Sequence, residues 1–392
     1  MWDVSDSQPD KDLKSLKTVR VLSIFGTRPE AIKMAPVVKA LQANPSIDSR
    51  VCVTGQHREM LDQVLSLFDI HPDVDLNLMQ PNQQLAGLTS EILVHLDAIY
   101  SKMKPEWILV QGDTTTAMAS ALGAFYQRIK VGHVEAGLRT FDKWQPFPEE
   151  VNRRIISTVA DLHFAPTEHS RNNLLHEGIP DESIKVTGNT VVDALNTIVN
   201  RPAPVEVTDL LETLGISETR QLILITAHRR ENFGEPLEHI CQAILQLADA
   251  FGDQMRFVYP VHRNPNVSEP VHRLLGHHKS IQLLDPLEYL PLVHLLKNAR
   301  LVLTDSGGIQ EEAVSLGKPT LVLREKTERP EGLESGILKL VGTDPKTIVN
   351  AVNSVLNSSD QNFRQGYCNP FGDGQASHRI VDAILDHREF TG

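Results

Sequence analysis

Long apolar runs, paired cysteines and an excess of positive charge are all missing from this sequence of 392 residues. No apolar run approaches the roughly 18 residues that a membrane span needs, so we predict no membrane partner. The three cysteines, Cys52, Cys241 and Cys368, lie far apart without a CxxC pair, which excludes a disulfide framework. The formal net charge of −12 disfavours binding to nucleic acid. Together these absences predict a cytoplasmic protein with reduced cysteines.

Residues 1–17 have none of the features of a targeting segment. A secretory signal needs an apolar stretch, and transit peptides are poor in acidic residues. This segment is polar and carries four aspartates, Asp3, Asp6, Asp10 and Asp12. We therefore predict that residues 1–17 form a disordered extension.

Apolar strand-like runs alternate with helical stretches along the chain, which is the pattern of a parallel sheet with crossover helices. A chain of this length exceeds one ordinary core, so we predict an α/β protein with two domains of similar size. Pro202 and Pro204 disfavour both helix and sheet, so we place the link between the domains within residues 187–207. The clearest predicted strands are residues 19–25, 50–54, 107–110, 130–134, 222–226, 256–261, 301–304 and 320–323.

Polar residues directly follow most of these predicted strands. In open α/β sheets, ligands bind beyond the carboxyl ends of the strands. One polar loop residue means little, but many such ends in two domains predict a single ligand site in a cleft between them. The segments concerned are Gly26-Thr27-Arg28, Gly55-Gln56-His57-Arg58, Gln111-Gly112-Asp113, Glu135-Ala136-Gly137, His228-Arg229-Arg230, His262-Arg263 and Asp305-Ser306-Gly307-Gly308.

The segment 26–33 has the pattern of a tight turn that leads into a helix. Thr27 and Glu30 have capping-box spacing, and a well-capped helix alone would explain this pattern. The functional interpretation adds Arg28 and Lys33, which would lie near the positive helix end, where an anionic group binds. The glycine pattern GxGxxG is absent here and elsewhere, which argues against an NAD cofactor.

The segment 305–312, DSGGIQEE, follows a predicted strand and opens a helix. Gly307 and Gly308 let the backbone approach a ligand closely, and Ser306 stands where free N–H groups would bind phosphate. Glu312 lies one helical turn further on, where a carboxylate accepts hydrogen bonds from ribose hydroxyls, as acidic residues do in dinucleotide-binding folds. The alternative is a glycine turn followed by a solvated acidic helix.

Asp113, Glu135 and Glu149 are the candidates for proton transfer. Carboxylates partly closed off from water have raised pKa values and exchange protons with a substrate, whereas isolated carboxylates are usually solvated surface groups. His228 follows a predicted strand and either donates to a phosphate, acts as an acid or has a structural role. Short matches to metal-binding patterns, such as DxD at residues 73–75, are too common to indicate a metal site, so we predict none.

At these residues the sequence resembles the non-hydrolysing UDP-N-acetylglucosamine 2-epimerases. The matching runs follow one another in order along the chain, and such length and order make chance similarity negligible. They are FGTRPEAIKMAP (25–36), GQHREMLDQVL (55–65), GDTTT (112–116), GHVEAGLRT (132–140), FPEEVNR (147–153), TGNTVVDAL (187–195), AHRREN (227–232), YPVHRNPNV (259–267), DPLEYLP (285–291), LTDSGGIQEEAVSLGKP (303–319) and TERPE (327–331).

The resemblance implies two Rossmann-like domains with parallel sheets that face each other across a cleft, as in the GT-B glycosyltransferases. We expect an N-terminal domain at residues 18–190, completed by a C-terminal helix at 372–392, and a UDP-binding domain at 191–371. The implied catalytic residues are Asp113, Glu135 and Glu149, to which we add His228. The implied substrate-binding residues are Arg28, Lys33, Ser306, Gly307, Gly308, Glu312 and Arg329.

The implied reaction is the reversible conversion of UDP-N-acetylglucosamine to UDP-N-acetylmannosamine, by elimination and re-addition of UDP through a glycal. It needs no cofactor, and we expect a homodimer whose only other partner is the UDP-sugar. Gln56 and His262 would line a second, activating substrate site. Three alternatives remain open: a hydrolysing epimerase that releases N-acetylmannosamine, a GT-B glycosyltransferase, and an inactive nucleotide-sugar sensor.

Overall fold

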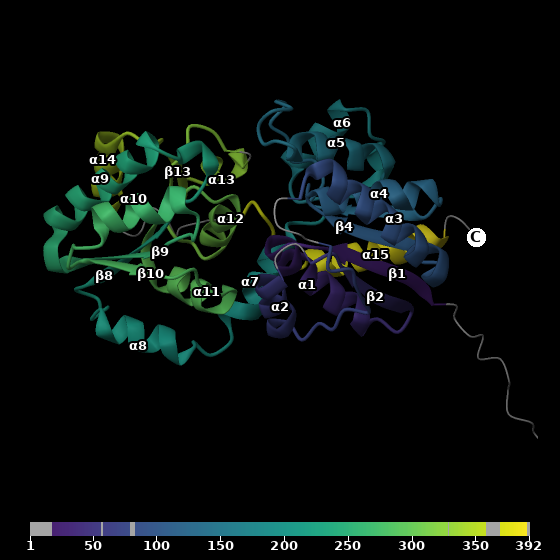
Figure 1. Cartoon of the computed structure of the whole chain (residues 1–392), viewed down its shortest axis with the longest axis horizontal. Helices are drawn as coiled ribbons and strands as arrows, with labels where there is room; N and C mark the ends of the chain where they lie inside the picture. Colours follow the sequence, from purple (N-terminus) through teal and green to yellow (C-terminus); the bar gives the residue numbers. More distant parts are fainter. Residues whose placement is uncertain (1–17, 56–57, 79–82, 328, 358–368, 390–392) are drawn as a thin grey trace, which may run out of the picture.

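The computed structural model of the chain describes residues 18–55, 58–78, 83–327, 329–357 and 369–389. The extension predicted at residues 1–17 and the candidate Gln56 lie outside these ranges. The described chain forms two α/β units that lie side by side, each built on its own sheet (Figure 1). The predicted α/β fold with two parallel sheets is therefore confirmed.

The first sheet has seven parallel strands in the order β3-β2-β1-β4-β5-β6-β7. The interior strand β1 is buried at six of its seven positions, as expected for a parallel sheet covered on both faces. The strands are β1 (Val19–Phe25), β2 (Ile47–Val53), β3 (Val74–Asp75), β4 (Trp107–Gln111), β5 (Lys130–Val134), β6 (Leu162–Ala165) and β7 (Ile184–Val186).

The second sheet has six parallel strands in the order β10-β9-β8-β11-β12-β13. In both sheets the first strand of the unit is third in the spatial order, and the order reverses beside it, which is the doubly wound Rossmann arrangement. The strands are β8 (Gln221–Thr226), β9 (Met255–Pro260), β10 (Ile281–Leu284), β11 (Ala299–Thr304), β12 (Thr320–Val322) and β13 (Leu338–Leu340).

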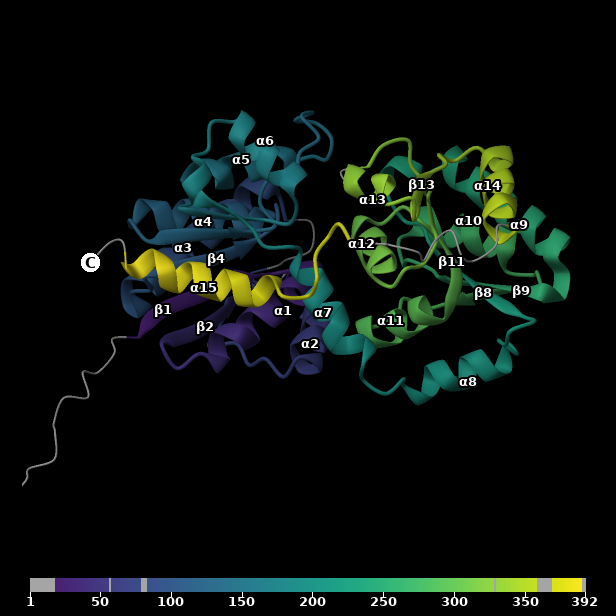
Figure 2. The same cartoon turned by 180° about the vertical axis from the view of Figure 1, so that it is seen from behind.

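Helices cover both faces of each sheet (Figures 1 and 2). Among the described residues, no helix combines the length and the apolar character that a membrane span requires. The helices of the first unit are α1 (Arg28–Ala43), α2 (Arg58–Leu67), α3 (Leu85–Met103), α4 (Thr115–Tyr126), α5 (Glu149–Val159) and α6 (Glu168–His176). Those of the second are α8 (Val205–Thr213), α9 (Glu235–Phe251), α10 (Pro265–Leu275), α11 (Tyr289–Asn298), α12 (Gly307–Ser315), α13 (Pro330–Glu334) and α14 (Pro345–Asn357). The described chain also has three short 3-10 turns, η1 (Asp181–Ser183), η2 (Arg230–Asn232) and η3 (Gly252–Gln254).

Each predicted strand coincides with a strand of the structure to within three residues at either end. The strands β3, β6, β7, β10 and β13 are not predicted, because each has only two to four residues. Such short runs carry too little periodicity to be told apart from loops.

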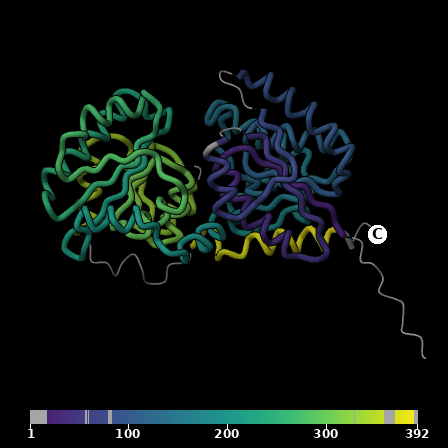
Figure 3. Tube along the Cα trace, turned by 60° about the horizontal axis from the view of Figure 1, so that its bottom comes forward, coloured from purple at the N-terminus to yellow at the C-terminus, as the bar shows by residue number. Residues whose placement is uncertain are grey.

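Two helices join the units, α7 (Thr190–Val199) and α15 (Ala376–Glu389). The first part of α7, at Val191, packs with apolar residues of the second unit, whereas Leu195 and Ile198 enter the core of the first. The helix α15 follows the second unit in sequence but packs along α1 of the first (Figure 2). The chain therefore crosses between the units twice, and Figure 3 shows the two crossings running close together.

Candidate active site

The carboxyl ends of β1 and β4, and those of β8 and β11, carry most of the predicted site residues. In each sheet these two strands flank the point where the strand order reverses, which is where open α/β sheets bind ligands. The helix α1 begins there, and its predicted capping box between Thr27 and Glu30 is confirmed. Arg28, the first residue of α1, has its electrostatic neighbours in the other unit, at Glu312 and Tyr289. The two sets of strand ends therefore face a common region.

Lys33 and Glu135 form a buried ion pair in the first unit. The Lys33 Nζ lies 2.5 and 2.7 Å from the two carboxylate oxygens of Glu135, and Gln111 donates a further hydrogen bond to that carboxylate. Burial alone would raise the pKa of Glu135, but the Lys33 and Arg329 charges lower it below its usual range. Glu135 is thus held as a carboxylate.

The backbone of Glu135 also marks it as unusual, because its φ of 65° lies in the left-handed region that non-glycine residues rarely adopt. Such conformations cost free energy and persist where the surroundings enforce them, often at functional sites. Gly112, at the neighbouring strand end, lies so close that a Cβ there would be 3.7 Å from the Glu135 carboxylate. The turn after β5 therefore directs the Glu135 side chain toward α1 and β4.

Glu311 and Arg329 form a second buried pair, in the second unit. The Arg329 Nε lies 2.6 Å from Glu311 Oε1. Asn189, at the start of α7, joins the two pairs, because its Nδ2 lies 3.2 Å from an oxygen of Glu135 and 3.2 Å from an oxygen of Glu311. We call these five residues, Lys33, Glu135, Asn189, Glu311 and Arg329, the interdomain cluster.

Asp113 and Glu149 lie on the side of the site nearer α5. The Asp113 carboxylate pairs with Arg153 at 2.6 Å, which fixes its orientation. Burial raises the pKa of Glu149, and the Asp113 charge adds to this effect, while Arg153 and Arg229 oppose it. Because Arg229 belongs to the second unit, Glu149 also lies in the electrostatic field of both units.

His228 follows β8 in a loop that Asp305 holds in place. Asp305 Oδ2 accepts hydrogen bonds from the backbone N–H groups of His228 and Arg229 at 2.9 and 2.8 Å, and from the Asn232 side chain at 2.9 Å. Burial lowers the pKa of His228, against the opposing effect of Asp305. The His262 ring stacks on the His228 ring with centroids 5.4 Å apart. His262 therefore adjoins the site, whereas its predicted companion Gln56 lies outside the described residues.

The start of α12 presents Gly307 and Gly308 with no side-chain cap from Ser306, so its first N–H groups have no local side-chain acceptor. A Cβ on Gly307 would lie 2.6 Å from an Arg329 nitrogen, whereas a Cβ on Gly308 would meet no atom within 4 Å. One turn further along, burial raises the pKa of Glu312 to about 7. This arrangement suits a phosphate at the helix start and a hydroxyl-bearing group beside the carboxyl.

The structure thus brings together the predicted residues that it describes, but it also shows partners that sequence reasoning missed. Gln111 and Asp305 lie at the polar strand ends. Nothing in the local sequence indicates that Gln111 donates a hydrogen bond to Glu135 or that Asp305 accepts hydrogen bonds from the His228 loop. Asn189 lies within the predicted link and has a local signal, an asparagine before a helix. Glu311 shares the acidic pair with Glu312, and Arg153 lies in a matched run without a predicted role.

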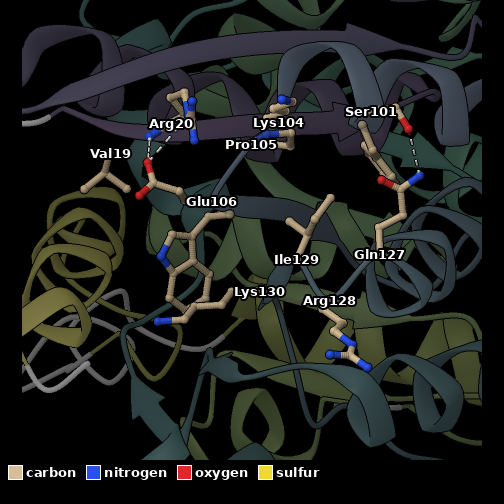
Figure 4. Close-up of a pocket in the computed structure, with 12 residues that line it drawn as sticks. Val19, Arg20, Ser101, Lys104, Pro105, Glu106, Gln127, Arg128, Ile129 and Lys130 are labelled. Carbon is tan, nitrogen blue, oxygen red and sulfur yellow. Dashed lines mark hydrogen bonds and ion pairs between the residues drawn. The ribbon is translucent and has the colours of Figure 1, made fainter. Parts of the chain in front are cut away.

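A cavity of about 630 Å³ lies elsewhere, at the amino ends of β1, β4 and β5 (Figure 4). Polar groups of its lining interact with one another. The backbone N–H of Arg20 donates to the Glu106 carboxylate at 3.1 Å, and the Lys130 amine lies 5.5 Å from the centre of the Trp107 ring. It lies at the opposite end of the strands from the interdomain cluster. In the part of the chain that the structure describes, no three metal-ligating side chains gather at one point.

Comparisons with known proteins agree with this geometry. The family described as UDP-N-acetylglucosamine 2-epimerase matches residues 39–385. The UDP-N-acetylglucosamine 2-epimerase of Salmonella typhimurium is 54% identical over 375 residues, which cover 94% of this chain and 99% of that protein. A Neisseria meningitidis UDP-GlcNAc 2-epimerase bound to UDP-GlcNAc has a TM-score of 0.87 at 48% identity, covering 94% of this chain and 100% of that one. A co-structure of S. aureus MnaA with UDP has a TM-score of 0.88 at 46% identity, covering 95% and 97%. The chain therefore belongs to the UDP-N-acetylglucosamine 2-epimerase family.

Proposed function

We propose that the chain interconverts UDP-N-acetylglucosamine and UDP-N-acetylmannosamine without hydrolysis and without a redox cofactor. The observation that carries this proposal is the placement of Asp113 and Glu135 just after strands β4 and β5, and of Glu149 at the start of α5, in the unit that faces the uncapped start of α12. The lowered pKa of Glu135, beside Lys33, and the raised pKa of Glu149, from burial, support it, because such a separation lets one site hold a base and an acid at the same pH. Relatives that carry the epimerase name, one of them bound to UDP-GlcNAc, support the choice of substrate.

The reaction requires that two bonds break together, because the C2 proton is not beside a carbonyl and is only weakly acidic. A base takes the proton, the C2–H electron pair becomes the C1–C2 double bond, and the C1–O pair leaves with UDP. The oxygen of UDP then adds back to C1 of the glycal, and C2 receives a proton on the opposite face. No electrons are gained or lost overall.

The described side chains divide between these tasks. Asp113, Glu135 and Glu149 would transfer protons at C2, as positioned carboxylates do. The start of α12 and the cations at Arg28 and Arg329 would stabilise the charge on departing UDP. Glu312 would bind the ribose, and His228, beside Arg229, would donate to the departing phosphate. These roles rest on the resemblance and on the positions given above.

We expect the enzyme to place deuterium at C2 when UDP-N-acetylglucosamine is converted in heavy water without added NAD or metal. The proton that returns to C2 comes from a carboxyl that has exchanged with solvent, so both epimers should become labelled as the mixture approaches equilibrium. Proton NMR of the C2 signal follows this directly. Epimerisation with full retention of the C2 proton would contradict the proposal.

The same experiment separates the competing reactions. A hydrolysing epimerase would accumulate UDP and free N-acetylmannosamine, whereas the proposed enzyme keeps the sugar attached to UDP. A glycosyltransferase would leave C2 unlabelled and would require an acceptor.

We also propose the domain division given by the sequence, residues 18–190 with the helix at 372–392, and residues 191–371. The division of α7 between the two cores supports a junction at its start.

A cytoplasmic location is supported by Cys52 and Cys241, which are free and buried. A second substrate site at Gln56 and His262 is supported by the stacking of His262 on His228.

We propose that the enzyme is a homodimer that pairs through the outer faces of α3 and α4. Val94, Phe125 and Tyr126 are exposed by 67%, 55% and 67%, whereas the most exposed large apolar side chains described on α2 and α5, Met60 and Val151, are each exposed by 39%. The helices α3 and α4 pack side by side, so these side chains lie on neighbouring helices of one layer. Exposed large apolar side chains gathered on neighbouring helices indicate an interaction site, and most homo-oligomers pair through one self-complementary patch.

Replacing Val94 and Phe125 together by aspartate is expected to convert the dimer to a monomer. Four carboxylates would then meet across a symmetric interface, where like charges repel. Light scattering coupled to size-exclusion chromatography measures the mass. Val205→Asp, at an equally exposed valine on α8, is the matched control and should remain dimeric. A wild-type mass of one chain would contradict the proposed assembly.

A further inference from the structure

Asn189 occupies the point where the two crossings of the chain between the units touch. It is the N-cap of α7, and its Oδ1 accepts a hydrogen bond from the Val191 N–H at 3.1 Å. Its own backbone N–H donates to the Phe371 carbonyl at 2.7 Å, on the segment that returns to α15. Beside it, a Cβ on Gly188 would lie 3.2 Å from the Gly372 Cα, so the two crossings are in contact.

The side-chain amide of Asn189 links one carboxylate of each unit. A carboxamide has two N–H groups, and here one faces Glu135 and the other faces Glu311, both at 3.2 Å. The Asn189 side chain is buried, as are both carboxylates. Both polar atoms of the side chain therefore have partners, which lie in the turn after β5, on α12 and at the start of α7.

We propose that Asn189 is a positioning residue that couples the placement of the nucleotide-binding helix α12 to the orientation of Glu135. This inference rests on the proposed function. Glu311 is the neighbour of Glu312 on α12, the helix whose start would bind the phosphates. A shift of α12 relative to the first unit moves Glu311 away from Asn189, so the amide is held between the two carboxylates, and its bond to Glu135 is fixed in direction, only when α12 is in place.

The charges of the interdomain cluster explain why this position suits a neutral amide. Lys33 and Glu135 balance each other in the first unit, and Arg329 and Glu311 do so in the second. Burial raises the pKa of Glu311, and the Glu135 charge adds to this, so the two carboxylates repel each other. An amide that donates to both relieves this repulsion without adding a charge, whereas a third carboxylate would increase it.

Asn189→Ser separates the positioning role from helix capping. Serine keeps an N-cap oxygen for α7 but is too short to donate to both carboxylates. We expect kcat to fall about 10- to 100-fold, while the KM and the UDP dissociation constant change less than about twofold, because a hydrogen bond to a catalytic charge is lost away from the nucleotide. The acidic limb of the kcat profile should move up by about one pH unit, since Glu135 loses a donor to its charged form.

Asn200→Ser is the matched control, because Asn200 lies at the exposed far end of the same helix and bonds only its own helix backbone among the interactions described. It should leave kcat and the pH profile unchanged. A wild-type pH profile in Asn189→Ser would overturn the inference. So would a fall in kcat with the acidic limb of the profile unmoved, because a disturbed cap of α7 lowers kcat without changing the donors of Glu135.

Hydrogen exchange measures the coupling without relying on catalysis. We expect UDP to slow backbone exchange at both residues 130–138 and residues 305–316 of the wild-type enzyme, and only at residues 305–316 in Asn189→Ser. Equal protection of both segments in the variant would overturn the inference. If the wild-type enzyme places no deuterium at C2, the proposed function fails, while this exchange measurement still decides whether Asn189 couples the two units.

Discussion

Glu135→Gln, Glu149→Gln and Asp113→Asn are each expected to lower kcat by about 10²–10⁴, the usual contribution of a group that transfers a proton. Each change replaces a carboxyl by an amide of nearly the same shape that cannot exchange a proton. UDP affinity should change far less, because the start of α12 and Glu312 stay intact. Initial rates give kcat, and calorimetry with UDP gives the dissociation constant.

Glu168→Gln is the control for these variants, since Glu168 is an exposed residue on α6 and its only described ion pair is with Arg171. Glu135→Gln needs one further check, because losing half of a buried ion pair is destabilising and leaves Lys33 beside a neutral group. Its circular dichroism and melting temperature should therefore be measured with the rates. Carboxyl variants that lose UDP binding but keep their turnover would show that the two halves of the site are assigned the wrong way round.

Local features of this site are predictable from the sequence because their partners are close in the chain. The capping box between Thr27 and Glu30 spans three residues, and the structure has both of its hydrogen bonds. The polar segments are equally easy to predict, since each one directly follows its own strand in the sequence. Parallel sheets then bring those ends to one edge without further information.

The pairings inside the site are not predictable in this way. Lys33 and Glu135 are 102 residues apart, and Asn189 and Glu311 are 122 residues apart. Their contacts depend on which strand lies beside which and on how two units meet across α7, and neither is encoded in short spacing. The left-handed backbone at Glu135 is also hidden, because glutamate is not a residue that favours positive φ.

These long-range pairings decide the chemistry that residue type alone leaves open. Glu135 directly follows β5 and Glu312 lies within α12, and the pKa values of these two glutamates move in opposite directions. Glu135 has Lys33 against its carboxylate, whereas for Glu312 burial outweighs its neighbouring charges. The same side chain is therefore kept charged at one position and poised near neutrality at the other.

Glu312→Gln is expected to weaken UDP binding about 10- to 100-fold and, at the same time, to stabilise the unliganded protein at pH 8 by about 1–3 kcal/mol. The pKa of Glu312 is raised by burial to about 7, from an ordinary value near 4.5. The folded state therefore keeps a proton that the unfolded chain releases, and stability falls as the pH rises from about 4.5 to 7. Above pH 7 the full cost of the buried charge is present, about 3 kcal/mol for a shift of this size. Glutamine removes that cost but is a weaker acceptor for ribose hydroxyls than a carboxylate.

Thermal and urea unfolding at pH 5 and pH 8 test the stability effect, which should be small at pH 5, where Glu312 is protonated and resembles an amide.

The ratio of the UDP dissociation constants of variant and wild type tests the binding effect, and titration of UDP itself cancels in that ratio. It should grow as the pH rises through 7, because only the wild-type site gains a charged acceptor. Glu206→Gln, at an exposed glutamate on α8, should change neither quantity. A Glu312→Gln variant that is less stable than wild type at pH 8, with a binding ratio independent of pH, would mean that Glu312 is already ionised and satisfied without the nucleotide. The pKa of Glu312 would then not be raised, and ribose binding would have to be assigned to another residue of the second unit.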